Sequence, residues 1–193
     1  MFQSPYATLV LMWIIFAFIH SGLASNEMVR GMGRRMGKYY RPAYSLLVLV
    51  VLLLLIHYHF SAIETILFSP HWILKIISGI LSLSGFVVIV VSLWTNLLAA
   101  TGISLLLGID TQQGFSQDGL HRYVRHPLYT GVLFFLWGVF FGYPYQNNLV
   151  SAVCFTIFLG VGIYFLEKKL LVQYGDEYRA YQKRVPRVLP RRI

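Results

Sequence analysis

Residues 72–98, WILKIISGILSLSGFVVIVVSLWTNLL, decide the fold of this chain, because Lys75 is the only charged residue in this apolar run. About 20 consecutive apolar residues are enough to cross the hydrocarbon core of a bilayer as a helix. Lipid offers no hydrogen-bond partners to the backbone, so such a segment must satisfy its own amide and carbonyl groups. The run therefore predicts a membrane-spanning helix with length to spare.

Four further apolar runs, at 5–24, 42–60, 127–143 and 149–166, have the same character. The composition agrees, since 57% of the residues are hydrophobic and 12% are charged, against about 45–50% and 25% in soluble domains. We therefore predict an all-α, polytopic membrane protein with about five transmembrane helices. No linker-like segment divides the chain, so residues 1–193 are expected to form a single domain.

Basic residues gather in alternate connections, which predicts the orientation of the chain. The connections after the first and third spans are basic, whereas 61–71 and the short link PYQNN at 144–148 contain no Lys or Arg. The segment after the fifth span is the most basic, with Lys168, Lys169, Arg179, Lys183, Arg184, Arg187, Arg191 and Arg192. The positive-inside rule then places the N-terminus outside and the C-terminus in the cytoplasm.

The net charge of +9 raises the question of a partner. The basic residues flank apolar spans rather than an aromatic-studded soluble face, so anionic membrane lipids are the expected partner and nucleic acid is not. The single cysteine, Cys154, lies within an apolar run and leaves no disulfide or thiolate cluster. Because His, Cys and Asp are not clustered elsewhere, no metal site is expected.

Two finer patterns concern packing. Ser78, Ser82 and Gly85 follow one another at near-helical spacing, which predicts a small-residue strip for close helix contact. In the C-terminal part, tyrosines 174, 178 and 181 and Val185 form one stripe of a helix with charges elsewhere. We predict a cytoplasmic amphipathic helix there, which either lies on the membrane surface or packs against other cytoplasmic loops.

Polar residues meet at one expected level of the membrane. Arg125 and His126 precede Pro127, which opens the fourth span, and Glu167 closes the fifth. Ionisable groups at membrane depth often mark function, and the start of a helix after proline favours an anionic ligand. The competing interpretation is that the arginines are membrane anchors and that Glu167 is a solvated helix end. His20 and Asn96 are expected at the same level.

The segment GLHRYVRHPLYTG, residues 119–131, is followed after one span by EKKLLVQYGDEYRAYQKRVPRVLP, residues 167–190. Together they resemble the two-part C-terminal signature of the isoprenylcysteine carboxyl methyltransferase and phospholipid methyltransferase superfamily. The earlier segments FAFIHSGLASNEMVRG (16–31) and YYRPAYSLL (39–47) are similar to NnrU-type membrane proteins and methanethiol S-methyltransferases. This likeness and the small size favour a bacterial plasma membrane.

The resemblance implies a membrane methyltransferase that uses S-adenosylmethionine, with its cofactor region at roughly 101–190. The acceptor would be a lipid, an isoprenoid or a small thiol. The catalytic candidates are Arg125, His126 and Glu167. The cofactor contacts implied by the resemblance are Gln113, Gly114, Phe115, Ser116, His121, His126, Pro127, Leu128, Tyr129 and Glu167.

The chain departs from the family pattern at three points. The fifth span carries no arginine just before Glu167, where the prenylcysteine enzymes of the family hold their substrate carboxylate, which argues against a prenylcysteine acceptor. Where the family often has adjacent glutamates, the sequence reads Leu166 and then Glu167, and His121 stands where tyrosine is common. If the acceptor must lose a proton, His20, His126 and Glu167 are equal candidates for the base. Two other functions remain open: a membrane reductase of the sterol type using NADPH, and a non-enzymatic NnrU-like protein.

Overall fold

A computed structural model describes residues 4–62, 65–101, 103–107 and 115–190, without the side chains of 26, 95–100 and 105. Asn96, named above as a candidate, thus has its side chain outside the described set. The elements in chain order are α1 (Pro5–Leu23), α2 (Asn26–Met36), η1 (Gly37–Tyr39), α3 (Tyr40–Ser61), α4 (Trp72–Thr101), α5 (Ile103–Leu107), η2 (Gly119–Arg122), α6 (Pro127–Gly142) and α7 (Gln146–Arg184).

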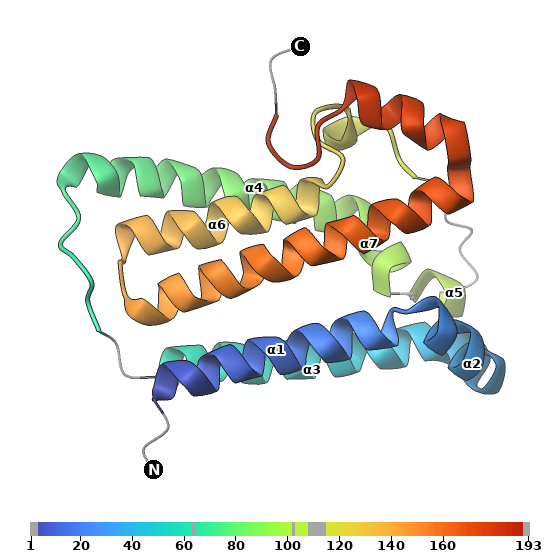
Figure 1. The fold of residues 1–193 in the computed structure, drawn as a ribbon, viewed down its shortest axis with the longest axis horizontal. Coiled ribbons are helices and arrows are strands. Elements are labelled where there is room, and N and C mark those ends of the chain that lie inside the picture. Colours follow the sequence, from blue (N-terminus) through green and yellow to red (C-terminus); the bar gives the residue numbers. More distant parts are fainter. Residues whose placement is uncertain (1–3, 63–64, 102, 108–114, 191–193) are drawn as a thin grey trace.

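Five long helices lie roughly along one axis, and successive ones run in opposite directions (Figure 1). The predicted all-α architecture is confirmed. Four segments are long and apolar enough to cross a membrane, namely Pro5–Leu23, Glu27–Ser61, Trp72–Trp94 and Gln146–Arg184. The remaining long helix, α6, is also apolar but has 16 residues, which is about 24 Å at 1.5 Å per residue. The chain is therefore a multi-pass membrane protein.

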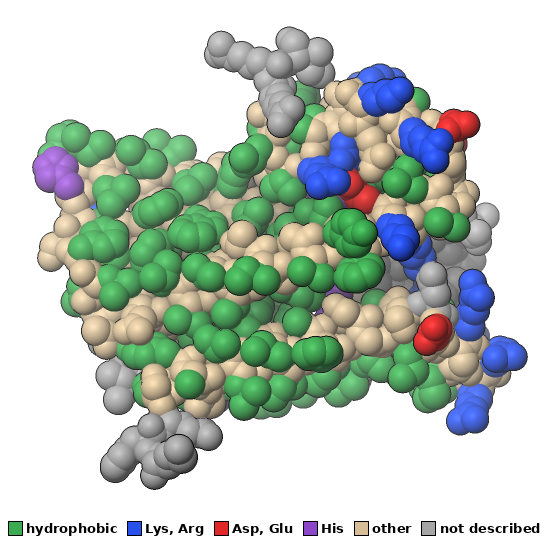
Figure 2. All heavy atoms as spheres, viewed as in Figure 1, with side chains coloured by type: hydrophobic (Ala, Val, Ile, Leu, Met, Phe, Trp, Pro, Cys, Tyr) green, Lys and Arg blue, Asp and Glu red, His purple; other side chains and the backbone are tan. Residues whose placement is uncertain are grey.

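Basic side chains gather at one end of this bundle (Figure 2). This is the end at which α2 and the C-terminal part of α7 lie, while green hydrophobic side chains cover most of the remaining visible face. Many large apolar residues are exposed along the middle of the helices, including Phe18 at 75% and Leu46 at 62%. An apolar belt with a basic end is the surface expected of a protein whose surroundings are lipid.

The closest helix pair is α4 with α6. A Cβ atom built on Gly85 would collide with the backbone nitrogen of Phe135 and lie 2.6 Å from the carbonyl oxygen of Gly131. One built on Gly138 would lie 2.5 Å from Ser82 Oγ. Small residues on both helices thus let the two backbones touch, and the small-residue strip expected on the third span is confirmed.

Helix α1 packs between α3 and α7 around Leu9, Trp13, Phe16 and Leu55. At the end opposite the basic cluster, polar side chains tie these helices together. Trp13 Nε1 donates to Ser151 Oγ at 3.1 Å, and the ring nitrogens of His59 lie 2.9 Å from Ser151 Oγ and 3.0 Å from Asn148 Oδ1. These contacts fix α7 against α1 and α3.

The C-terminal helix differs from the expectation. Instead of a separate amphipathic helix, α7 continues from the last span, is apolar over most of its length, and bends at Gly175, whose φ is 53°. The positive φ is one that glycine adopts at little cost. The bend turns Tyr178, Tyr181 and Val185 back toward Phe115, where they form a buried cluster. The tyrosine stripe therefore packs against a loop, which was one of the two outcomes considered.

Candidate functional site

Glu167 lies at the centre of a buried polar network. Its side chain is 4% exposed, and Arg125 approaches Oε1 through Nε at 2.8 Å and through a terminal nitrogen at 2.6 Å. The other oxygen, Oε2, accepts from Arg187 Nε at 2.9 Å and from Gln182 Nε2 at 3.3 Å. With both oxygens engaged by cationic or amide donors, Glu167 is held as a carboxylate and is poorly suited to take up a proton.

The hydrogen-bond donors of Arg125 are likewise engaged by several partners. Its guanidinium also donates to the carbonyl oxygens of Gln182, at 3.0 Å, and of Val185. The side chain is 6% exposed. A buried arginine whose donors are shared among a carboxylate and two carbonyls is a structural anchor between α6 and α7. Its place at the rim of the site is therefore that of a positioning residue.

The segment 185–188, which we call the C-terminal strap, runs across the start of α6. The backbone nitrogens of Arg125 and His126 donate to the carbonyl oxygens of Pro186, at 2.8 Å, and Arg187, at 3.1 Å. Thr130 Oγ1 donates to the carbonyl oxygen of Val188 at 2.8 Å. The strap thus occupies two of the amides near the helix start, and the fixed φ of Pro127 begins the helix directly after them.

His126 is buried between the polar network around Glu167 and a cavity that it lines. Its Nε2 is 3.3 Å from Glu167 Oε1, and its ring stacks on that of Tyr129 with centroids 5.8 Å apart. Burial lowers the pKa of His126, outweighing the opposing effect of Glu167. The neutral ring is thus favoured near pH 7. Because a carboxylate only accepts hydrogen bonds, Nε2 carries the hydrogen and Nδ1 is left as the proton acceptor.

A cavity of about 310 Å³ with both polar and apolar walls opens beside His126. Its size is at the lower end of the range for small-molecule sites, about 300–1,000 Å³. The cavity is lined by Ser92, Ser116, His121, Arg125, His126, Pro127, Leu128, Tyr129 and Leu166. The structure thus brings most of the candidate residues around one hollow, with Glu167 buried directly behind Arg125 and His126.

His121 helps to shape the wall of this cavity. Its Nδ1 is 3.1 Å from the carbonyl oxygen of Arg125, and its own carbonyl oxygen accepts from Tyr181 Oη at 2.7 Å. Burial lowers the pKa of His121, against a smaller opposing effect of its hydrogen bond to Arg125. The neutral form is again favoured, so both histidines contribute uncharged imidazole rings to a wall that also contains Arg125.

The remaining candidates lie elsewhere. Phe115 belongs to the buried aromatic cluster with Tyr178, next to the cavity wall at Ser116. Gln113 and Gly114 lie outside the described residues. His20 packs its ring on Phe16 and Phe158, with centroids 5.8 and 5.5 Å away, and does not line the cavity. Of the three candidate bases, His126 alone lines the cavity.

Four residues of the site were not anticipated: Ser92, Leu166, Gln182 and Arg187. Leu166 could have been inferred, because it directly precedes Glu167. Gln182 and Arg187 meet Glu167 only because α7 bends at Gly175 and the strap returns. Among the described residues no group of His, Cys, Asp and Glu side chains is arranged to hold a metal ion.

Comparison with known proteins adds to this geometry. The family model described as NnrU protein matches residues 8–189, nearly the whole chain. The chain belongs to the NnrU family. The comparison with solved structures found no match for this NnrU-family chain.

Several curated relatives of the NnrU-family chain are methyltransferases. The methanethiol S-methyltransferase of Pseudomonas sp. (strain GM41(2012)) is 25% identical over 97% of this chain and 75% of its own length. Methanethiol S-methyltransferase 1 of Bradyrhizobium diazoefficiens is 35% identical over 42% of this chain. The protein-S-isoprenylcysteine O-methyltransferase of Schizosaccharomyces pombe is 36% identical over 38%. The matches to the last two span 27% and 31% of those relatives. The chain is thus a distant homologue of membrane methyltransferases.

Proposed function

We propose that this protein is an integral membrane methyltransferase that uses S-adenosylmethionine and methylates a hydrophobic acceptor or a small thiol. The observation that carries the proposal is the cavity beside His126. Six of the ten cofactor contacts implied by the methyltransferase resemblance line it, from Ser116 and His121 to the run 126–129, together with Arg125. The relatives named methyltransferases support the same class of reaction.

The donor groups of the cavity suit this cofactor. Serine and tyrosine hydroxyls and two neutral imidazoles can pair with ribose hydroxyls and with an adenine edge, while Pro127, Leu128 and Leu166 offer apolar wall. The aromatic faces of Tyr129 and His126 favour a sulfonium cation nearby. Bound there, the cofactor would supply an electrophilic methyl group on a positively charged sulfur.

The chain's own residues would align the partners and handle one proton. Methyl transfer is an in-line displacement, so it depends on alignment and on exclusion of water. A thiol acceptor must give up its proton as the new bond forms, and the proposed base is Nδ1 of His126, because Nε2 is hydrogen-bonded to Glu167. Arg125 and Glu167 hold the imidazole in the required tautomer.

An apolar groove on the other side of the network supports a hydrophobic acceptor. It has a volume of about 530 Å³ and lies among α4, α6, α7 and the strap, with walls such as Leu133, Trp137 and Ile163. Arg187 lines this groove while its Nε binds Glu167. The groove and the cavity are therefore coupled through one carboxylate.

The first test is calorimetric titration of the purified protein with S-adenosylmethionine, S-adenosylhomocysteine and NADPH. We expect both adenosyl compounds to bind and NADPH not to. His126→Ala should weaken S-adenosylhomocysteine about tenfold, because it removes one stacked and hydrogen-bonding wall of the cavity. His57→Ala, an exposed histidine of α3, is the matched control. Binding of NADPH alone would indicate the reductase, and binding of none of the three would favour a non-enzymatic role.

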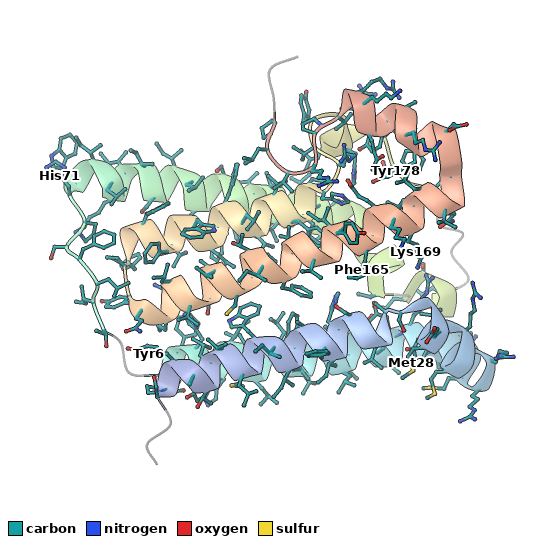
Figure 3. All side chains as sticks on the ribbon, in the orientation of Figure 1. Tyr6, Met28, His71, Phe165, Lys169 and Tyr178 are labelled. Carbon is teal, nitrogen blue, oxygen red and sulfur yellow. The ribbon has the colours of Figure 1, made fainter. Side chains whose placement is uncertain are left out.

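We further propose that the basic end of the bundle faces the cytoplasm. In a Cys154→Ser background, a cysteine placed at His71 should react with a membrane-impermeant maleimide added from outside. One placed at Asp118 should react only after the membrane is opened. The two sites lie at opposite ends, where His71 is labelled in Figure 3 and Asp118 is next to η2. The reverse labelling pattern would invert the orientation.

A further inference from the structure

A third hollow lies at the basic end of the bundle, between α2 and α7. Its volume is about 480 Å³. Arg30 of α2 forms one side, and Phe165, Lys168, Lys169, Val172 and Gln173 of α7 form the other. The α7 residues recur at helical spacing and so share one face. Figure 3 shows Phe165 and Lys169 along this part of α7, above α2 in the view.

The charge of this hollow, which we call the basic groove, is one-sided. Arg30, Lys168 and Lys169 line it, and no carboxylate does. Over the described ranges, none of these three cations takes part in an ion pair. Glu27, one turn before Arg30, is the acidic residue nearest to Arg30 in α2. Glu167 precedes Lys168 in sequence but is engaged by Arg125 and Arg187.

An apolar track leads along α7 to the groove. Ile157, Val161 and Phe165 follow at intervals of four residues and are 63%, 54% and 62% exposed. Their positions on successive turns form a continuous strip that faces away from the helix bundle. The strip ends at Phe165, which lines the basic groove together with Lys168 and Lys169.

We propose that the basic groove binds the phosphate of one anionic phospholipid, with an acyl chain lying along Ile157, Val161 and Phe165. A phosphate needs cationic donors, and an acyl chain needs an exposed apolar strip directly continuous with them. A zwitterionic lipid brings an ammonium group into a site of three cations and is disfavoured there. None of the six lining residues lines the cavity beside His126, so the basic groove and that cavity are separate sites.

The test is native mass spectrometry of the protein in a neutral detergent, titrated with phosphatidylglycerol or phosphatidylcholine. One phosphatidylglycerol should bind in preference to phosphatidylcholine. The variant Arg30→Gln, Lys168→Gln, Lys169→Gln should bind it roughly a hundredfold more weakly, at about fivefold per cation removed. The matched control Arg35→Gln, Lys38→Gln, Lys183→Gln removes three exposed cations outside the groove. It should leave the affinity nearly unchanged.

Several results would overturn the proposal. Equal weakening in the control would mean that general surface charge, not the groove, attracts the lipid. If phosphatidylcholine bound as tightly as phosphatidylglycerol, the charge of the headgroup would not determine binding at the groove. Displacement of the lipid by millimolar inorganic phosphate would identify a site for free phosphate instead. If the triple variant does not purify as a folded protein, Lys169→Gln alone should show the fivefold loss, and its absence would count equally against the site.

Discussion

Replacing Gly85 with leucine is expected to prevent α4 and α6 from packing. Even the first carbon of the new side chain would collide with the backbone of Phe135 and lie 2.6 Å from the carbonyl oxygen of Gly131. Backbone atoms cannot swing aside as a flexible side chain can, so the helices must separate along their whole contact. Overpacking costs about 1–3 kcal/mol when neighbours can adjust, and here we expect at least the upper value.

The measurement is thermal unfolding of the detergent-solubilised protein followed by size-exclusion chromatography. Gly79→Leu is the matched control on the same helix, because a Cβ atom at Gly79 meets nothing within 4 Å. The control should unfold near the wild-type temperature, whereas Gly85→Leu should unfold well below it or aggregate. Equal stability of the two variants would mean that α4 and α6 lie farther apart than described here.

The second large effect is expected for Glu167→Ala. This substitution leaves the Arg125 guanidinium, 6% exposed, without its carboxylate. Removing one partner of a buried ion pair typically costs about 3–5 kcal/mol, because the remaining charge is neither paired nor hydrated. The same change frees the imidazole of His126, so we expect the affinity for S-adenosylhomocysteine to fall more than tenfold where the protein can be purified.

A double variant separates the two consequences. Arg125→Met with Glu167→Met removes both buried charges, so stability should recover toward the wild-type value while ligand binding stays weak. Glu177→Gln, an exposed glutamate of the same helix, should change neither quantity. An unaltered unfolding temperature for Glu167→Ala would contradict the buried network. If the double variant bound S-adenosylhomocysteine with wild-type affinity, the Arg125–Glu167 network would not belong to the binding site.

The helical bundle was predictable because hydrocarbon imposes its constraint locally. Each apolar run had to become a helix whatever its neighbours did. The observed ends of α1, α3, α4 and α6 and the start of α7 lie within three residues of the expected ones, whereas α7 runs on to Arg184 instead of ending near residue 166. The hydropathy pattern does not predict helix α2, because its residues form a charged connection between two apolar runs. Its start has a local signal, as Ser25 accepts a hydrogen bond from the backbone of Met28 and Glu27 lies in the first turn.

The candidate site was predictable only where its residues are adjacent in sequence. The run 125–129 is visible as a polar entrance to a span, whereas Arg187 and Gln182 reach Glu167 through a bend and a returning strap. Gly175 permits that bend, but the spacing of apolar residues along α7 does not predict where the helix bends. Helical spacing alone likewise could not decide whether the tyrosine stripe would face lipid or protein, because an aromatic face suits both.

The C-terminal strap has a consequence for biosynthesis. The hydroxyl of Thr130 donates to the carbonyl oxygen of Val188, a residue 58 positions later in the chain. The start of α6 is therefore synthesised before its hydrogen-bond partners in the strap exist. Until α7 has been released and has turned back, Arg125 has neither Glu167 nor the carbonyl oxygens it binds. Membrane insertion of the earlier spans therefore precedes completion of the site. Quality-control machinery would encounter a nascent bundle in which the polar network around Glu167 has not yet formed.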